Sequence, residues 1–191
     1  MIRSVKRTFT PAEYLKMEEA AESKSEYYAG EILAMAGGTS DHSLVAVNLT
    51  IELGQQLATK PCRLYNSDMR LFIEQSGLYT YPDAMIVCGK VQQAKGRKDT
   101  VTNPNLIVEV LSESTRDYDR GQKFKFYKQI PSLQESVLVE SENARVEYYR
   151  RGDGDKWMIE IHEGLDALLK LESIECEIPL QRIYNKVSWL E

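Results

Sequence analysis

Residues 106–111 read Leu-Ile-Val-Glu-Val-Leu, an apolar run that only Glu109 interrupts. A run of this length and composition is typical of a strand covered on both faces of a sheet. Residues 84–88 (Ala-Met-Ile-Val-Cys) have the same character and follow Asp83 directly. A buried carboxylate costs several kcal/mol unless a cation or hydrogen-bond donors compensate it. We therefore expect Asp83 and Glu109 either to share one cation or to be satisfied separately by basic side chains and backbone amides.

The surrounding sequence predicts helices and further strands. Thr10, Pro11 and Glu13 form a helix start signal, with a capping threonine, a proline in the first turn and a glutamate three residues after the cap. The elements expected are helices over 11–22, 42–58 and 116–130, a hairpin over 25–36, strands over 68–74, 84–88, 106–111, 135–141, 145–150, 156–162 and 173–178, a loop over 89–104 and a short helix after Pro179. This order predicts an α/β or α+β fold in which helices flank a central mixed sheet, and a length of 191 residues predicts a single domain.

The composition excludes several classes of protein. The 24 basic and 29 acidic residues give a net charge of −5, which disfavours coating of nucleic acid through bulk charge. No apolar run is long enough to span a membrane. The three cysteines, Cys62, Cys88 and Cys176, lack a paired spacing, so we expect no disulfide framework or zinc site and a reducing, cytoplasmic location. Because there are only two histidines, a metal site would rely on oxygen ligands and favour magnesium-like ions.

The predicted helix over 116–130 can add a basic group to the carboxylates. Asp119, Lys123 and Tyr127 lie four residues apart, on one stripe of the helix. Lys123 follows Glu109 by 14 residues, enough to leave the strand, turn and travel one helical turn, so a helix packed on that strand could direct Lys123 to the strand's end. The alternative is an exposed Lys123 that pairs only with Asp119.

Several segments resemble the Uma2 family, restriction-endonuclease-like proteins abundant in cyanobacteria. The resemblance runs from about Thr10 to Tyr184. It is carried by the segments 25–32 (Ser-Glu-Tyr-Tyr-Ala-Gly-Glu-Ile), 81–84 (Tyr-Pro-Asp-Ala), 106–112 (Leu-Ile-Val-Glu-Val-Leu-Ser), 119–124 (Asp-Arg-Gly-Gln-Lys-Phe) and 127–133 (Tyr-Lys-Gln-Ile-Pro-Ser-Leu), and by His42 at a helix start. The resemblance implies the PD-(D/E)XK nuclease fold, with the active site at the strand ends. Asp83 and Glu109 then match the acidic residues of the motif.

One position departs from that motif. A lysine is expected two residues after the acid, but this position is Leu111. The Uma2 pattern moves the amine to the following helix, where Lys123 fits.

The resemblance implies a magnesium-dependent endonuclease that hydrolyses DNA phosphodiester bonds. Asp83, Glu109 and the carbonyl of Val110 would hold Mg²⁺, with Mn²⁺ as the alternative ion, and Lys123 would position the attacking water. Glu31 and His42 are further candidates: His42 for orienting a ligand or water, or else for capping and packing, and Glu31 for the site or else for a solvent-facing hairpin position.

A local excess of positive charge offers a place for DNA. Between Lys90 and Lys128 there are nine basic and five acidic residues. This predicts a phosphate-binding groove, for double-stranded DNA, formed by Lys95, Arg97, Lys98, Arg116 and Arg120. By analogy with nucleases that cut both strands, we also expect a homodimer, for which the strands over 145–162 could supply a pairing edge.

Two other functions remain open at this point. Leu111 and the net acidity suggest a catalytically degenerate nuclease fold that acts as a nucleic-acid- or protein-binding module. A glycosidase using Asp83 and Glu109 as an acid/base pair is the third possibility, but the sequence offers no aromatic-rich sugar platform and leaves Lys123 without a role.

Overall fold

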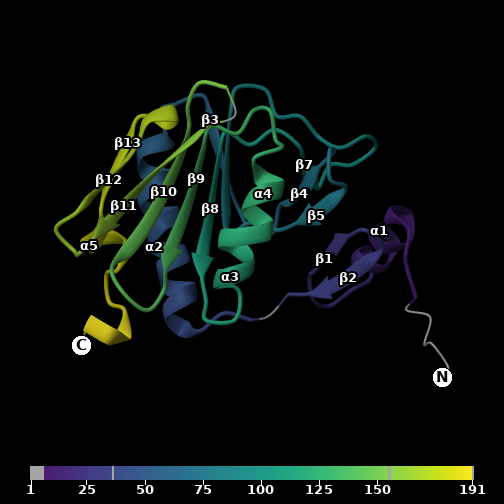
Figure 1. The fold of residues 1–191 in the computed structure, drawn as a ribbon, viewed down its shortest axis with the longest axis horizontal. Coiled ribbons are helices and arrows are strands. Elements are labelled where there is room, and N and C mark those ends of the chain that lie inside the picture. Colours follow the sequence, from purple (N-terminus) through teal and green to yellow (C-terminus); the bar gives the residue numbers. More distant parts are fainter. Residues whose placement is uncertain (1–6, 36, 155, 191) are drawn as a thin grey trace.

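The computed structural model describes residues 7–35, 37–154 and 156–190 (Figure 1). Its main sheet has six strands, in the order β11 (Trp157–Glu163), β10 (Arg145–Arg151), β9 (Glu135–Glu140), β8 (Leu106–Leu111), β6 (Ala84–Cys88) and β3 (Cys62–Asn66). β8 and β9 are parallel, and the other neighbours in this sheet are antiparallel. The strands predicted over 84–88 and 106–111 are confirmed, and both lie in the interior of this sheet.

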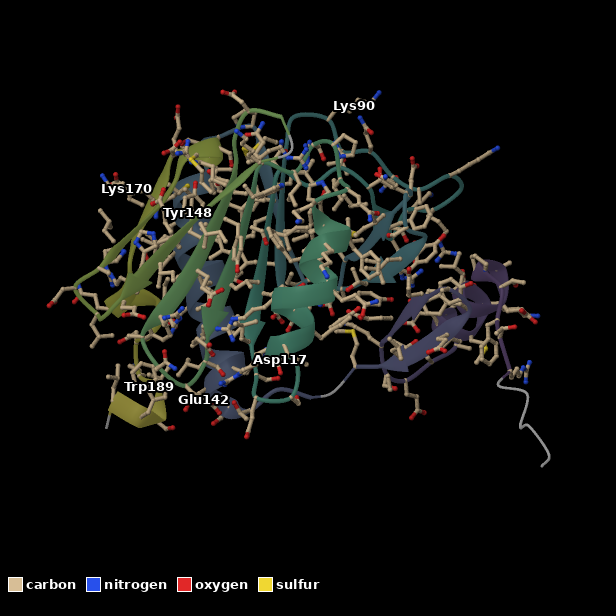
Figure 2. The ribbon with its side chains drawn as sticks, in the orientation of Figure 1. Lys90, Asp117, Glu142, Tyr148, Lys170 and Trp189 are labelled. Carbon is tan, nitrogen blue, oxygen red and sulfur yellow. A yellow bond between two sulfur atoms is a disulfide. The ribbon has the colours of Figure 1, made fainter. Side chains whose placement is uncertain are left out.

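Helices cover both faces of the main sheet (Figure 1). One face packs against α2 (Ser40–Leu57) and against α5 (Leu180–Ile183). The buried side chains of α2 occur at every fourth residue. The other face packs against a helical segment made of α3 (Arg116–Tyr118), the π-helix η1 (Asp119–Lys123) and α4 (Phe124–Tyr127). Apolar side chains fill both interfaces, whereas Lys90 and Lys170 extend outward (Figure 2). The predicted fold class, a mixed sheet flanked by helices, is confirmed.

β8 shows how the two faces divide along one strand. Val108 and Val110 pack into the core beneath α2, whereas Ile107 and Leu111 pack into the core beneath the helical segment. Alternate residues of a strand point to the same face, so the side chain of Glu109 lies with those of Ile107 and Leu111 on the face that the helical segment covers.

A second sheet of five strands extends the molecule on its amino-terminal side (Figure 1). Its strands, in spatial order, are β2 (Glu31–Ala34), β1 (Ser25–Tyr28), β5 (Leu78–Thr80), β4 (Arg70–Ile73) and β7 (Thr100–Val101). α1 (Pro11–Glu19) begins with the predicted capping box at Thr10, and its Tyr14 stacks on Tyr27 of β1. The predicted hairpin is confirmed as β1–β2.

Some elements differ from their prediction. α1 ends at Glu19, and the helix predicted over 116–130 contains a π-helical turn and ends at Tyr127. The expected strand over 173–178 is instead a 3-10 turn, η2 (Glu172–Ile174), followed by β13 (Cys176–Pro179), which pairs with β12 (Leu168–Leu171). A 3-10 turn, η3 (Ser188–Leu190), lies near the carboxyl terminus. The short strands β3, β5, β7 and β12 were not predicted, because they lack a long apolar or alternating run.

The expectation that the cysteines form no disulfide is wrong. Cys62 of β3 and Cys88 of β6 are directly opposite in the antiparallel pair and are disulfide-bonded, with their Cα atoms 3.9 Å apart. A separation of 26 residues in sequence does not reveal this cross-strand register. The cysteine count therefore no longer argues for a reducing compartment. Cys176 is buried and free. Among the described residues, no helix combines the length and apolar character needed to cross a membrane.

Candidate active site

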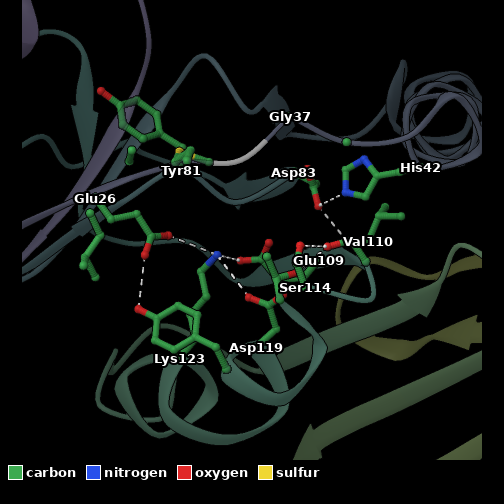
Figure 3. A pocket seen from close by; sticks show the side chains of 17 residues that line it. Glu26, Gly37, His42, Tyr81, Asp83, Glu109, Val110, Ser114, Asp119 and Lys123 are labelled. Carbon is green, nitrogen blue, oxygen red and sulfur yellow. Dashed lines mark hydrogen bonds and ion pairs between the residues drawn. The ribbon is translucent and has the colours of Figure 1, made fainter.

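Three parts of the chain meet around a cavity of about 390 Å³, which we call the pocket (Figure 3). They are the adjoining ends of β6 and β8, the α3–η1 segment, and the β1–β2 hairpin with its connection to α2. Its polar lining includes Glu26, His42, Asp83, Glu109, Ser112, Tyr118, Asp119 and Lys123. Leu33, Ala34 and Met35 form an apolar wall.

The strand register brings Asp83 and Glu109 together. Asp83 directly precedes Ala84 of β6, which is opposite Val108 of β8, so Asp83 enters the sheet beside the strand that carries Glu109. The Asp83 carboxylate contacts His42 of α2, whereas Glu109 lies beneath the helical segment. The backbone N–H of Val110 donates a hydrogen bond of 2.7 Å to Asp83 Oδ2. The two carboxylates that the sequence singled out therefore line the same pocket, and the charge of Asp83 adds to the rise in the pKa of Glu109.

Lys123 reaches these carboxylates from the helical segment. Its Nζ lies 2.9 Å from Glu109 Oε1, 3.2 Å from Glu26 Oε1 and 3.4 Å from Asp119 Oδ1 (Figure 3). Lys123 is only 5% exposed, so the alternative of an exposed lysine paired only with Asp119 is wrong. Leu111, at the position where the motif expects lysine, is wholly buried in the core beneath the helical segment. The ammonium group therefore comes from the helical segment and not from β8.

His42 and Glu31 are placed differently. His42 lies in the first turn of α2, where its backbone N–H donates to the capping Thr39 Oγ1. Its Nε2 is 3.6 Å from Asp83 Oδ2, within the pocket. Glu31 does not line the pocket; it borders a separate hollow with Tyr28 and Tyr118. The structure thus joins His42 to Asp83 and leaves Glu31 outside.

Burial dominates the electrostatics of the pocket. It raises the pKa of Glu109 to about 8, although Lys123 and a hydrogen bond from the Tyr127 hydroxyl oppose this shift. Burial also raises the pKa of Asp83 against the opposing effects of His42 and the Val110 N–H. For Lys123, burial lowers the pKa, but the nearby carboxylates, Glu109 first, outweigh it and hold the pKa well above its usual value. Four carboxylates face one ammonium group and one imidazole, an excess that favours binding of a further cation.

Sequence reasoning missed part of the pocket. Glu26 of β1 is 6% exposed, accepts hydrogen bonds from the hydroxyls of Thr80 and Tyr118, and contacts Lys123. In the sequence, Glu26 is only a charged residue inside a short hairpin strand. This pattern indicates burial less clearly than the position of Glu109 inside a long apolar run. Tyr127 was placed on the stripe of Lys123 but was given no role, and it donates to Glu109.

The five basic residues predicted to bind phosphate lie outside the pocket lining. Lys95 and Lys98 are exposed on the loop that precedes β7. The three arginines meet carboxylates: Arg97 pairs with Glu19 and Asp99, Arg116 with Glu140 and Glu142, and Arg120 with Glu140 and Glu147. The structure therefore gives these arginines partners within the chain, which the sequence did not predict.

The donors in the pocket suit a hard divalent cation. Within the described ranges, no three histidine, cysteine or acidic side chains gather closely enough to hold a metal ion by themselves. An ion at Asp83 and Glu109 would need the Val110 carbonyl, water or substrate oxygens to complete its coordination. Mg²⁺ binds in this way, through one or two carboxylates plus waters and phosphate oxygens. The residues present therefore fit Mg²⁺ or Mn²⁺ better than zinc.

Comparisons with known proteins identify a family and a fold. Residues 11–181 match the family model Uma2, described as "Putative restriction endonuclease". Two proteins of Synechocystis sp. are similar: the uncharacterized protein sll1609 is 38% identical over 83% of this chain and 90% of its own length, and the uncharacterized protein slr1290 is 37% identical over 94% and 93%. A crystal structure of a "putative nuclease belonging to DUF820" from Anabaena variabilis superposes with a TM-score of 0.77 at 18% identity, covering 96% of this chain and 99% of the other. This last likeness concerns the fold.

Proposed function

The chain belongs to the Uma2 family, and from that premise we propose that it is a metal-dependent endonuclease that hydrolyses DNA phosphodiester bonds in the pocket. Its fold is nuclease-like. One observation carries the proposal: Lys123, from the helical segment, lies 2.9 Å from Glu109 in the pocket that Asp83 also lines. Two acidic groups near the ends of neighbouring strands can bind a divalent ion, and an ammonium group beside them can stabilise the charge that develops in phosphodiester hydrolysis.

The roles of the residues follow from their positions. Asp83, Glu109 and the carbonyl of Val110 would hold Mg²⁺ or Mn²⁺. When bound, such an ion neutralises charge on the phosphate and lowers the pKa of a coordinated water. Lys123 would hold the attacking water or stabilise the charge that develops on the phosphate. His42 would orient Asp83 or a water beside it, at 3.6 Å from Asp83 Oδ2. Glu31 has no role in this proposal, because it borders another hollow.

Binding of double-stranded DNA is the less supported half of the proposal. Lys95 and Lys98 are exposed and available to phosphates. The three arginines would have to exchange their carboxylate partners for phosphate oxygens. The loss of those ion pairs offsets much of the free energy gained from the phosphate. We therefore assign DNA contact first to the two lysines and to the metal ion.

The test is cleavage of a supercoiled plasmid in Mg²⁺ or Mn²⁺. We expect cleavage that EDTA abolishes, and a loss of at least about a hundredfold in Asp83→Asn and Glu109→Gln. Glu147→Gln is the matched control, because Glu147 is also a largely buried, ion-paired glutamate but lies outside the pocket. A wild-type rate in either pocket variant contradicts the assignment. DNA binding without cleavage in either metal would instead favour the degenerate binding module.

A further inference from the structure

β11 is an edge of the main sheet that carries exposed apolar side chains. Of its seven residues, Met158, Ile159 and Ile161 are 44%, 58% and 53% exposed. β11 pairs with β10 without a bulge from Trp157 to Glu163 and contains neither proline nor lysine. Proline, bulges and charged side chains, above all lysine, protect an edge strand from pairing with another chain. Of these features β11 carries only Glu160 and Glu163, beside three exposed apolar side chains.

Alternate backbone N–H and C=O groups of β11 point away from β10 and are available for such pairing. Gly164 N donates to Ala144 O and Gly152 N donates to Lys156 O, both over 2.9 Å, which fixes the even-numbered residues as those bonded to β10. In an antiparallel pair the intervening residues direct their N–H and C=O groups to the other side. The odd-numbered residues of β11, including Ile159 and Ile161, therefore direct both groups away from the sheet.

We propose that β11 is the interface of a homodimer, in which the β11 strands of two copies pair antiparallel about a two-fold axis at Ile161. The two six-stranded sheets then form one continuous sheet. This arrangement satisfies the outward backbone groups of both strands and closes the edge. The proposal is independent of the nuclease activity.

The side chains that become cross-strand neighbours select this register. With the axis at Ile161, the two Ile161 side chains meet and each Glu160 is opposite His162 of the second copy. With the axis at Glu160, the two Glu160 carboxylates would oppose each other, which destabilises a cross-strand pair. With the axis at Ile159, Glu160 would be opposite Met158 and Lys156 opposite His162, so that neither charged residue gains a partner of opposite charge.

The imidazole of His162 favours the same register. Its Nε2 is buried without a hydrogen-bond partner, and the nearest carboxylate oxygen, of Glu160 in the same chain, is 4.0 Å away. Buried polar atoms are normally hydrogen-bonded. The register at Ile161 brings the Glu160 of the second copy to the same face as this imidazole and so supplies a carboxylate to it.

The first experiment measures mass by light scattering over a dilution series. We expect the full chain to have about twice its 21.9 kDa mass. Ile161→Glu puts two carboxylates at the axis and should raise the dimer dissociation constant at least about a hundredfold. Ile51→Glu, at an isoleucine 49% exposed on α2, is the matched control and should leave the dimer unchanged. Circular dichroism melting shows whether both variants fold.

The second experiment tests the register by oxidation to an intermolecular disulfide. Ile161→Cys places two thiols opposite each other at a Cα separation of about 5.5 Å, within the range of a disulfide. Ile159→Cys places them about 14 Å apart, since the two copies of this residue are offset by four positions. We therefore expect a covalent dimer from Ile161→Cys and none from Ile159→Cys.

The two experiments distinguish an error in the interface from an error in the register. A monomeric wild-type chain at all concentrations, or an Ile161→Glu variant as dimeric as the wild type, overturns the interface. Crosslinking through Ile159→Cys and not through Ile161→Cys overturns the register. Dimerisation of wild type and Ile51→Glu, loss in Ile161→Glu and crosslinking through Ile161→Cys alone support both.

Discussion

Two clusters of charged residues share the helical segment over 116–127, and they are built differently. The pocket cluster comprises Glu26, Asp83, Glu109, Asp119 and Lys123. The arginine cluster comprises Arg116, Arg120, Arg145, Glu140, Glu142 and Glu147. In the pocket cluster three carboxylates share one ammonium group, whereas in the arginine cluster every carboxylate contacts at least one guanidinium. The same segment thus carries one unbalanced and one balanced cluster.

The pKa shifts of one glutamate from each cluster, Glu109 and Glu147, point in opposite directions. Burial raises the pKa of Glu109 to about 8. Burial also acts on Glu147, but hydrogen bonds from Arg120 and Tyr149 outweigh it and lower its pKa. A charged Glu147 therefore stabilises the fold, while a charged Glu109 costs stability. Sites that keep such a cost are commonly those that bind or react. We therefore propose a structural role for the arginine cluster and a chemical role for the pocket cluster.

The largest expected effect is on activity, from removal of the ammonium group. Lys123→Met should lower the rate of metal-dependent DNA cleavage by about a hundredfold to a thousandfold, because the water or the phosphate loses its charged partner. Arg145→Met is the matched control, since it removes a cation of the arginine cluster and should leave the rate of the folded protein within a few fold. Plasmid cleavage and circular dichroism provide the measurements. Equal losses in both variants would erase the distinction between the clusters.

The next effect is on the free energy of unfolding, which should change in opposite directions when a glutamate of each cluster is neutralised. Glu147→Gln should lower the free energy of unfolding by about 1–3 kcal/mol, because Arg120 and the Tyr149 hydroxyl lose a charged partner. Glu109→Gln should raise it by about 1 kcal/mol in metal-free protein, because a neutral amide avoids the cost that burial imposes on Glu109, whose pKa is raised to about 8. Urea unfolding at neutral pH measures both. Destabilisation by Glu109→Gln would show that the pocket cluster is structural.

The pH dependence should sharpen the same contrast. Glu109 binds its proton more tightly in the folded state, so its contribution is present below its usual pKa of 4.5 and is lost as the pH rises toward 8. Glu147 has a lowered pKa, so its contribution is present above 4.5 and is lost as the pH falls. We expect the advantage of Glu109→Gln over wild type to grow between pH 4.5 and 8. The deficit of Glu147→Gln should shrink in acid. Parallel pH profiles for the two variants would contradict the opposite pKa shifts.

The smallest effect concerns DNA contact. Because Arg116 and Arg120 are paired within the arginine cluster, Lys95 and Lys98 should provide the free positive charge. A Lys95→Ala/Lys98→Ala double variant should weaken DNA binding a few fold and reduce the slope of log affinity against log salt by about 2. Fluorescence anisotropy with labelled duplex at several salt concentrations measures this. An unchanged slope would remove the two lysines from the proposed DNA-contact surface.

Sequence patterns located the centre of the pocket because its signals are local. Asp83 and Glu109 each interrupt or adjoin a long apolar run, and such runs identify interior strands. Two carboxylates on interior strands have few ways to be satisfied, so their meeting could be expected. Lys123 could be placed at the end of the Glu109 strand because it follows Glu109 by 14 residues, which allow a short turn and one turn of helix packed back on that strand.

The remainder depends on contacts that no local pattern contains. Glu26 meets Lys123 from a strand almost a hundred residues earlier, by the packing of the hairpin on the helical segment. Arg120 finds Glu140 and Glu147 on β9 and β10. Cys62 and Cys88 bond because β3 pairs with β6 in one particular register. These features follow from the arrangement of whole strands and helices, which composition and periodicity do not specify.

The central claim is that Asp83 and Glu109 hold one divalent ion beside Lys123. The most direct test is an anomalous-scattering map from crystals of the full chain grown with Mn²⁺. We predict a manganese peak in the pocket at about 2.1 Å from carboxylate oxygens of both Asp83 and Glu109, with Lys123 nearby, and no such peak in Asp83→Asn. A pocket that stays free of manganese while the protein cleaves DNA in Mn²⁺, or a peak that contacts neither carboxylate, would contradict it.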